Sequence, residues 1–474
     1  LIALIMVTRK WFFALLSALV ITLTCFVLYQ ALPTLVVPEH SLADRKLEKV
    51  ISLFDLKPLP IRLYEADPKF LLGQALFFDP ILSGNREVSC ATCHLLKHGL
   101  SDGLARSIGT HGEGLGSDRR LTRGREIHPR NSLELWNRDN NAVKSFFWDG
   151  RVEVLDPESR LFRSPLGSAL PKGFQNALAV QSIFPLTVPD EMLGEYGEYS
   201  NSSLPEPHGN KLNGLIASKH FRNETERIQS VHVQVLKRLL GSGEAPENWQ
   251  MDYRQAFQDA YPNKNSNDYS IVDLGNAISH FEELAFGSNE SAWDRYLAGD
   301  TQAITDGAKQ GALIFYGKGR CAACHTGAIF SDFGYHNAGI YSKIDVQGEV
   351  VDDYGRWFTT RLAEDRYKFR TPPLRNSTKS APYFHDGSTP DLEGAIARHL
   401  KPLERAWSYL PDGSFAMETE QIETISPVFA SKISLTKDEI HSLVSFLTTL
   451  ESQSRDESQI VPRSVPSGLP VAYK

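Results

Sequence analysis

The sequence has no excess of positive charge and contains no arginine-rich run. Its 474 residues include 50 Lys and Arg against 57 Asp and Glu, which gives a formal net charge of −7. A nucleic-acid-binding surface needs a basic patch or stripe, so this balance excludes that class of function. The composition is not that of a disordered protein either, since 41% of the residues are hydrophobic. The length and apolar content suffice for two packed domains.

The first 36 residues differ from the rest of the chain, because they contain an apolar run of roughly 20 residues, about what a bilayer crossing requires. Arg9 and Lys10 precede this run. By the positive-inside rule the N-terminus then stays in the cytoplasm and the remainder is exported to the periplasm. The run lacks a good small-x-small cleavage site, which favours an uncleaved inner-membrane anchor over a signal peptide.

Cysteine is scarce, with five in the chain. Cys25 lies in the apolar run and is interpreted as a membrane-embedded residue. The other four form two motifs, Cys90-Ala-Thr-Cys93-His94 and Cys321-Ala-Ala-Cys324-His325. A zinc ribbon would need its two pairs only about 15–20 residues apart, and a redox dithiol would leave the duplicate motif unexplained. Covalent haem attachment explains both motifs, because two thiols at i and i+3 reach the porphyrin vinyl groups and the next histidine ligates the iron. We therefore predict two covalently bound haem c groups.

Similar segments precede the two motifs, Gly73-Gln-Ala-Leu-Phe-Phe78 and Gly311-Ala-Leu-Ile-Phe-Tyr316. This imperfect repeat indicates a helix that brings the chain to each haem. Apolar spacing predicts further helices over 274–284 and 436–447, the latter with a Thr436/Glu439 capping box. The stretch 195–213 is rich in Gly, Pro, Ser and Asn and predicts a long loop.

The expected fold is mainly α, with two cytochrome c-like haem domains behind the N-terminal segment. We expect the domain boundary near residues 265–300. The predicted organisation is an anchor or signal segment over 1–36, an N-terminal haem domain over 50–270, a C-terminal haem domain over 271–452 and a flexible tail over 453–474.

Four further motifs accompany the two haem motifs. They are Phe147-Trp-Asp-Gly-Arg151, the stretch Gln181–Met192 with its sequence QSIFPLTVPDEM, Leu374–Gly387 with its sequence LRNSTKSAPYFHDG, and Ala395-Ile-Ala-Arg-His399. In this order, over about residues 55–452, the chain closely resembles the bacterial dihaem cytochrome c peroxidase family, which includes the MauG-type enzymes.

The resemblance implies that the haem on His94 reacts with peroxide and that the haem on His325 receives electrons. Glu191 stands at the family's catalytic glutamate, and Gln181 and Pro185 keep the family's spacing to it. A carboxylate there can move a proton between the peroxide oxygens. Trp148 matches the tryptophan that relays electrons between the haems. The resemblance also implies a calcium ion between the haems, held by the three residues Asn131, Ser380 and Pro382, where oxygen ligands suit calcium.

Two departures from the family are informative. Typical peroxidases carry a distal methionine where this chain has His399, and MauG-type enzymes have a tyrosine in that neighbourhood. Bis-histidine ligation is the natural prediction and should lower the haem potential relative to methionine ligation. Met417 is the runner-up ligand, and a surface position for His399 is the third alternative. Many relatives block the first haem with a histidine after Ser-Ile-Gly, but here Thr110 follows Gly109 and His111 comes one place later. Either His111 still reaches the iron through a shifted loop, or the site is open at rest, and the glycine-rich stretch 112–116 favours the open site.

The predicted function is reduction of hydrogen peroxide to water with electrons from a respiratory donor, a small cytochrome c or a quinol. The alternatives are a MauG-like oxidase that modifies a protein partner, and a non-catalytic dihaem electron-transfer cytochrome. A homodimer is an expected assembly. His98, His128 and His280 are interpreted as structural or surface residues.

Overall fold

The computed structural model describes residues 41–61, 65–122, 127–195, 214–216, 220–241, 247–346, 349–402, 419–429, 433–452 and 457–473. The predicted N-terminal anchor with Cys25, the runner-up ligand Met417 and nearly all of the predicted loop 195–213 lie outside these ranges. Within them, no helix combines the length and apolar character that crossing a membrane requires. The chain forms two units, Leu1–Arg45 and Lys46–Lys474, and the second contains both CxxCH motifs.

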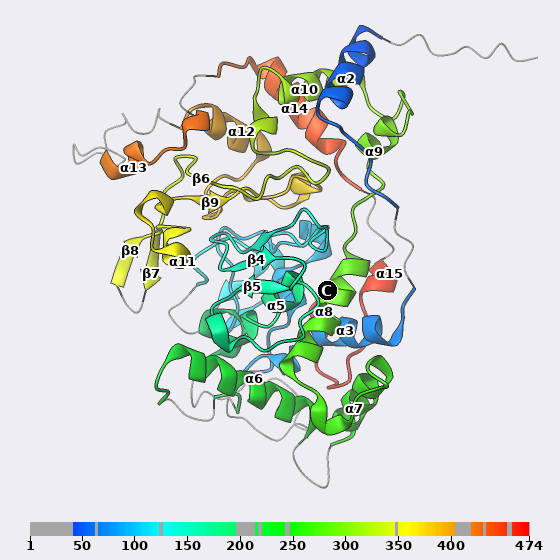
Figure 1. The fold of residues 1–474 in the computed structure, drawn as a ribbon, viewed down its shortest axis with the longest axis vertical. Coiled ribbons are helices and arrows are strands. Elements are labelled where there is room, and N and C mark those ends of the chain that lie inside the picture. The colour runs from blue at the N-terminus through cyan, green and yellow to red at the C-terminus, as the bar shows by residue number, and fades with distance from the viewer. Residues whose placement is uncertain are drawn as a thin grey trace, which may run out of the picture. The chain divides into compact units, whose positions relative to one another are not determined.

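The expectation of a mainly helical fold is confirmed (Figure 1). The longer helices are α2 (Leu42–Leu53), α3 (Pro68–Phe78), α6 (Glu224–Leu240), α7 (Asn248–Ala260), α8 (Ile271–Ala285), α10 (Asp306–Tyr316), α12 (Leu392–Leu400) and α14 (Lys437–Thr448). The shorter ones are α4 (Cys90–Cys93), α5 (Ala177–Gln181), α9 (Ala292–Leu297), α11 (Trp357–Thr360), α13 (Thr419–Glu423) and α15 (Glu457–Ile460). Both helices predicted from apolar spacing are present, as α8 and α14, and Thr436 forms the predicted capping box with Glu439.

The strands are short and pair antiparallel in small sheets. They are β1 (Gly112–Glu113) with β2 (Arg120–Leu121), β3 (Ser145–Phe146) with β4 (Val152–Asp156) and β5 (Leu161–Arg163), β6 (Tyr335–His336) with β9 (Phe369–Arg370), and β7 (Lys343–Val346) with β8 (Glu349–Asp352). None of these sheets is large enough to form a core of its own, so the helices carry the packing.

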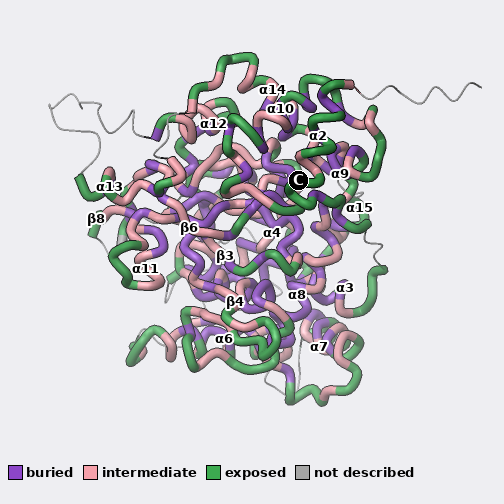
Figure 2. The backbone as a smooth tube through the Cα atoms, turned by 45° about the horizontal axis from the view of Figure 1, so that its top comes forward, coloured by how far each residue is buried: buried purple, intermediate pink, exposed green. Residues whose placement is uncertain are grey.

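Two hydrophobic cores organise the second unit. The first is built mainly from residues between Leu59 and Phe286, and the second mainly from residues between Trp293 and Leu450. Helix α8 lies at the centre of the first core, where twelve of its fifteen residues are buried (Figure 2). The change from one core to the other therefore falls after Phe286. This is within the expected range 265–300 but later than the boundary drawn at 270/271.

The ends of this unit are exchanged between the cores. Leu47 and Leu56 pack in the second core, whereas Ile460, Val465 and Leu469 are buried in the first. Ser467 donates a hydrogen bond through its hydroxyl to the buried Asp79 carboxylate, at 2.6 Å. The prediction of a flexible tail over 453–474 is corrected for residues 457–473, because their apolar side chains gain burial against the first core.

Helix packing explains the similar glycine-containing segments that precede the two CxxCH motifs. A Cβ on Gly73 would lie 2.0 Å from the carbonyl oxygen of Ala277 in α8, and one on Gly311 would lie 1.9 Å from that of Ser442 in α14. In each half, glycine therefore lets the helix before the motif approach a second helix more closely than any side chain would permit. The crossings of α3 with α8 and of α10 with α14 then set the position of each CxxCH segment.

Candidate functional site

Two cavities contain the two CxxCH motifs. The first, about 1070 Å³ including its solvent-open part, is lined by both thiols of the first motif together with His94, Gln181 and Glu191. The second, about 1670 Å³ on the same measure, is lined by Cys321, Cys324, His325 and His399.

The three predicted iron-ligating histidines share one arrangement. The Nδ1 atoms of His94, His325 and His399 lie 2.8, 3.2 and 2.8 Å from the backbone carbonyl oxygens of Leu100, Phe330 and Ala395. An imidazole that donates Nδ1–H to a carbonyl keeps its Nε2 lone pair for a metal. Burial lowers the pKa of all three rings, that of His325 to about 4, so each is neutral, as a ligand must be.

The four thiols in these motifs are free. Burial raises the pKa of Cys93 and of Cys321 to about 12. A redox-active dithiol requires the opposite shift, since its thiolate is the reactive form. The environment of these thiols therefore disfavours dithiol chemistry and agrees with attachment to a prosthetic group.

Two imidazoles face each other across the second cavity. The ring centroids of His325 and His399 are 6.3 Å apart, with His399 in the last turn of α12. Two metal–imidazole bonds of about 2 Å each, plus half of each ring, give a centroid separation of roughly 6 Å. The two rings are therefore spaced so that both would hold one iron between them, and bis-histidine ligation stays a prediction.

The first cavity has a different polar group beside its proximal histidine. Glu191 lies on a single π-helical turn, Pro189–Leu193, a local irregularity that often occurs at functional sites. Gln181, at the end of α5, and Pro185 line the same cavity, so the structure brings together the residues of the QSIFPLTVPDEM motif. Gly109 packs on this turn so closely that a Cβ there would lie 2.1 Å from the Glu191 carbonyl oxygen.

Glu191 is paired with a residue that we interpreted only as structural or surface. His128 Nε2 lies 2.8 Å from Glu191 Oε1, and each side chain is 18% exposed. Arg151 Nη2 is 3.8 Å from the same oxygen. Burial would raise the pKa of Glu191, but the charge of and hydrogen bond from His128 outweigh it and lower the pKa. No motif or spacing in the sequence indicates His128, because the pairing depends on how two distant loops meet.

His111, the alternative ligand of the first haem, is not among the residues that line the first cavity. Its backbone N–H donates to Glu87 Oε1 at 2.8 Å, and Thr110 Oγ1 donates to the Pro189 carbonyl oxygen at 2.9 Å. These bonds hold the Ser-Ile-Gly loop against the turn that carries Glu191. In this conformation His111 does not line the cavity that contains His94.

Trp148 and Arg370 line both cavities. Trp148 is buried, and its indole N–H donates to the carbonyl oxygen of Asn131 at 2.9 Å. A fixed, buried indole between two redox groups is suited to relay an electron. Asn131, Ser380 and Pro382, the predicted calcium ligands, all line the second cavity.

Buried arginine nitrogens that lack a hydrogen-bond partner provide a test of whether a haem fits the two cavities. Among the described residues, Arg138 Nη1 and Arg370 Nη2 are buried and have no hydrogen-bond partner. Leaving a buried guanidinium group unsatisfied is costly. Arg138 lines the first cavity and Arg370 both, so the carboxylates of a haem would supply the missing acceptors.

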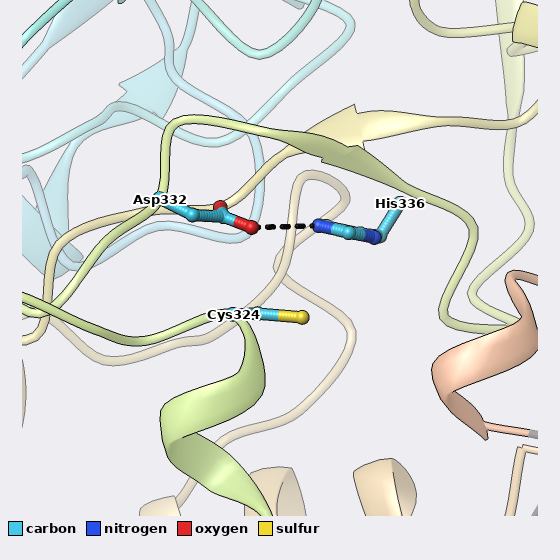
Figure 3. Close-up of side chains that lie close together, drawn as sticks. All are labelled: Cys324, Asp332 and His336. Atoms are coloured by element: carbon cyan, nitrogen blue, oxygen red, sulfur yellow. Dashed lines mark hydrogen bonds and ion pairs between the residues drawn. The ribbon is translucent and has the colours of Figure 1, made fainter.

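One other cluster has metal-ligand chemistry. Ligand atoms of Cys324, Asp332 and His336 lie within 4.8 Å of one another (Figure 3). His336 Nε2 is 3.0 Å from Asp332 Oδ2, a hydrogen bond that raises the pKa of His336 to about 9. The thiol of Cys324 belongs to the second CxxCH motif, and a thioether bond would remove it as a metal ligand. The cluster is therefore better explained as the surroundings of the second haem.

Comparison with known proteins agrees with this geometry. Residues 67–302 match the family model described as di-haem cytochrome c peroxidase. The chain is 28% identical to the methylamine utilization protein MauG of Methylorubrum extorquens, over 81% of this chain and 78% of that protein. It is also 28% identical to the cytochrome c551 peroxidase of Pseudomonas aeruginosa, over 75% of this chain and 79% of that protein.

A solved structure shows the same fold. It is that of a MauG-like protein associated with microbial copper homeostasis, with a TM-score of 0.54 at 23% identity, covering 86% of this chain and 95% of that one. The family-model match includes His94, Trp148 and Glu191 but ends before the second CxxCH motif.

Proposed function

The chain belongs to the dihaem cytochrome c peroxidase and MauG family, and from this premise we propose that it reduces hydrogen peroxide to water with two electrons from a small cytochrome c or a quinol. It is an oxidoreductase of the dihaem peroxidase type, and this family carries two c-type haems. The observation that supports this proposal is the difference between the residues that line the two cavities. One holds a single predicted iron ligand, His94, with the Glu191–His128 pair beside it, and the other holds two predicted iron ligands whose ring centroids are 6.3 Å apart.

That asymmetry divides the work between the two sites. An iron held by both His325 and His399 has no position left for peroxide, so the second cavity is suited to electron transfer. The first cavity has one predicted iron ligand, His94, and polar side chains across from it. When bound, haem would supply the electron exchange and the iron to which peroxide binds.

Side chains that line the first cavity would carry out the proton transfers. Glu191 would accept a proton from one peroxide oxygen and deliver it to the other, which makes the departing oxygen a good leaving group. Gln181 would hold the peroxide through its amide. Trp148 would couple the two cavities electronically, because its ring lines both.

Substitution of Glu191 tests this mechanism. In Glu191→Gln we expect a peroxide reaction slowed by about 10²–10⁴-fold, the usual contribution of a general acid/base, with both haems retained. The measurement is stopped-flow absorbance after stoichiometric peroxide, with haem content from a pyridine haemochrome assay. An unchanged rate would remove Glu191 from the mechanism.

A MauG-like oxidase that modifies a protein partner is the second candidate. It is supported by the similarity to MauG and by His399, which stands where a peroxidase would carry methionine. The absence of a tyrosine at that site argues against a close relationship with MauG itself. Steady-state turnover with reduced cytochrome c or quinol separates the two candidates, because only the peroxidase consumes peroxide repeatedly with such donors. A non-catalytic cytochrome would show no spectral change with peroxide at all.

Three further features belong to this proposal. A calcium ion would be held by Asn131, Ser380 and Pro382. The N-terminal segment, residues 1–36, would anchor the protein to the inner membrane with its haem domains in the periplasm. The protein would form a homodimer. Fractionation of cells and light scattering of the purified protein test the last two.

A further inference from the structure

His128 and Glu191 form a partly exposed pair, in which both ring nitrogens of His128 have hydrogen-bond partners. Nε2 of the ring lies 2.8 Å from Glu191 Oε1, and Nδ1 lies 2.9 Å from the carbonyl oxygen of Arg130. Both ring nitrogens thus face oxygen acceptors. An imidazole satisfies two acceptors only when it carries both protons. Nδ1 also lies 3.4 Å from the backbone nitrogen of Arg130. The raised pKa of His128 and the lowered pKa of Glu191 favour the doubly protonated ring, which forms an imidazolium beside a carboxylate with one proton available between them.

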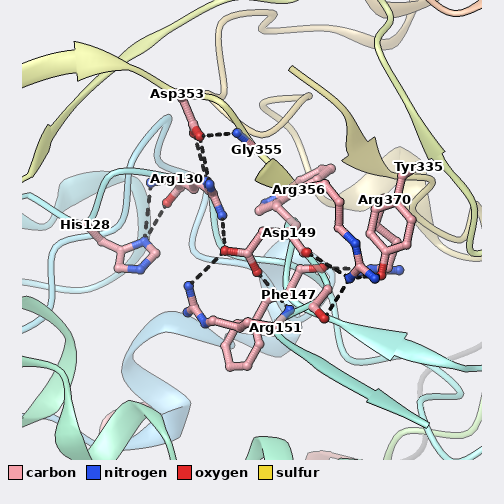
Figure 4. Close-up of polar contacts among 12 residues, drawn as sticks. His128, Arg130, Phe147, Asp149, Arg151, Tyr335, Asp353, Gly355, Arg356 and Arg370 are labelled. Atoms are coloured by element: carbon pink, nitrogen blue, oxygen red, sulfur yellow. Dashed lines mark hydrogen bonds and ion pairs between the residues drawn. The ribbon is translucent and has the colours of Figure 1, made fainter. Parts of the chain in front are cut away.

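The orientation of the His128 ring is fixed by its neighbours. Its backbone N–H donates to the Ser107 carbonyl oxygen at 3.0 Å. Arg130, whose carbonyl receives Nδ1–H, is itself held by Asp149 at 2.7 Å and by both oxygens of Asp353 at 2.7 and 2.8 Å (Figure 4). Bidentate, charge-assisted bonds of this kind are among the most rigid in proteins. The ring therefore presents Nε2 to Glu191 in a set geometry.

The chemistry of the proposed reaction requires such a group. Reduction of peroxide follows HOOH + 2e⁻ + 2H⁺ → 2H₂O. The proton that Glu191 moves between the two oxygens is returned, so breaking the O–O bond uses no external proton. The remaining oxygen leaves as water only after it gains two electrons and two protons. The electrons come from the donor, and the protons must come from solvent through groups at the site.

We infer that His128 is a positioning residue that orients Glu191 and passes it solvent protons for the second water. This inference rests on the proposed function. His128 lines the first cavity beside Glu191, and its 18% exposure gives it contact with solvent. A proton that leaves Nε2 for Glu191 is replaced from solvent, and the Glu191 carboxyl group then delivers it to the oxygen in the cavity. The imidazole and carboxylate end each cycle in their starting states.

The surrounding charges set the direction of the pH dependence. Burial would lower the pKa of His128, but the charge of and bond to Glu191 and the charge of Asp190 outweigh it and raise the pKa. Arg151 Nη2 lies 3.8 Å from the same Glu191 oxygen, and Asp102, whose pKa burial raises, is near enough to interact with the charge of His128. Proton supply should therefore be constant at low pH and fall only as the pH rises through the raised pKa of His128, above the ordinary value of about 6.5.

The test compares full-length, haem-loaded wild type with His128→Gln and His280→Gln. Glutamine still donates an N–H to Glu191 but cannot release a proton at neutral pH. His280 is a matched control, since its Nε2 pairs with Asp67 Oδ2 at 2.9 Å and neither residue lines a cavity described above. Two rates are followed between pH 5 and pH 9. They are the spectral change with stoichiometric peroxide, and the return to the resting spectrum with ascorbate as reductant.

In His128→Gln we expect the return to the resting spectrum to slow by about 10–100-fold, and its rate should no longer decrease at high pH. The first spectral change, after peroxide is added, should slow much less. His280→Gln should match wild type in both. A return in His128→Gln at the wild-type rate with the wild-type pH profile overturns the inference, as does an equal slowing in His280→Gln. If His128→Gln fails to bind haem, the same two rates are measured in His128→Asn and compared with the pH profile of wild type. A wild-type rate of return to the resting spectrum that does not fall at high pH overturns the inference.

Failure of the proposed function gives a different result. If wild type reacts with peroxide and returns with ascorbate but does not turn over with reduced cytochrome c or quinol, the peroxidase proposal fails and the role of His128 is still judged by the return rate. If wild type shows no spectral change with peroxide, both proposals fail.

Discussion

Gly311 offers a quantitative test of how the second haem site is built. In Gly311→Ala the new methyl group would lie 1.9 Å from the carbonyl oxygen and 2.5 Å from the carbonyl carbon of Ser442, and 2.8 Å from Phe446 Cβ. Two of these atoms are backbone, so relief requires that α10 and α14 move apart. Overpacking of this kind costs about 1–3 kcal/mol, and we take the upper end because no flexible side chain can yield.

Alanine also has an advantage in the helix interior of about 1 kcal/mol over glycine. The net expectation for Gly311→Ala is therefore a loss of about 2 kcal/mol in the free energy of unfolding. Gly307 lies in the same helix, and the nearest atoms to a Cβ there are 3.8 Å away. Gly307→Ala should change stability little or raise it by up to about 1 kcal/mol.

The assay is urea unfolding of both haem-loaded variants, followed by tryptophan fluorescence and by absorbance of the second haem. Phe315 of α10 and Leu443 of α14 both line the second cavity, so separation of the helices should also disturb the second haem spectrum. Gly311→Ala with wild-type stability, or Gly307→Ala with an equal loss, would refute the reasoning.

Four other outcomes are expected. His399→Ala should convert the second iron from low-spin to high-spin and open it to added ligands, as electron paramagnetic resonance would show; an unchanged spectrum would exclude His399 as a ligand. Arg130→Met should cost about 3–5 kcal/mol in urea unfolding, because it removes both charge-assisted bonds from the buried Asp353 carboxylate and leaves Asp149 with Arg151 as its remaining cationic partner. Burial would raise the pKa of Asp149, but Arg151 and Arg130 lower it to about 2; wild type should therefore keep this contribution above pH 4 and lose it as the pH falls towards 2, whereas Asp149→Asn should lack that loss. Treatment with EGTA should slow electron transfer between the haems if calcium lies at Asn131, and calcium but not magnesium should restore it.

Much of the site could be predicted from the sequence because its chemistry is local. A CxxCH motif carries both thiols and the ligand within five residues, and the spacing from Gln181 to Glu191 fits on one short helix and the turns after it. The helices α8 and α14 could be predicted for the same reason, since apolar spacing and a capping box are short-range signals.

The contacts that sequence reasoning missed are distant in the chain. Arg130 and Asp353 are 223 residues apart, and neither lies in a periodic segment. His128 meets Glu191 only because the loop that carries it is held beside a π-helical turn. The prediction of a flexible tail failed for a similar reason. Residues 457–473 contain few apolar residues, and nothing in their sequence indicates that these pack against the distant first core.

The exchange of chain ends between the two cores has a consequence for how this protein acquires its fold. Residues Ile460, Val465 and Leu469 complete the first core, yet the ribosome makes them after the whole second half. The amino-terminal half therefore cannot reach its final packing during synthesis, and its last buried surface closes only when nearly the whole chain has been made. A shortened chain that ends after α14 would keep both CxxCH motifs and every proposed ligand, but the first core would lose the side chains of Ile460, Val465 and Leu469 that cover it.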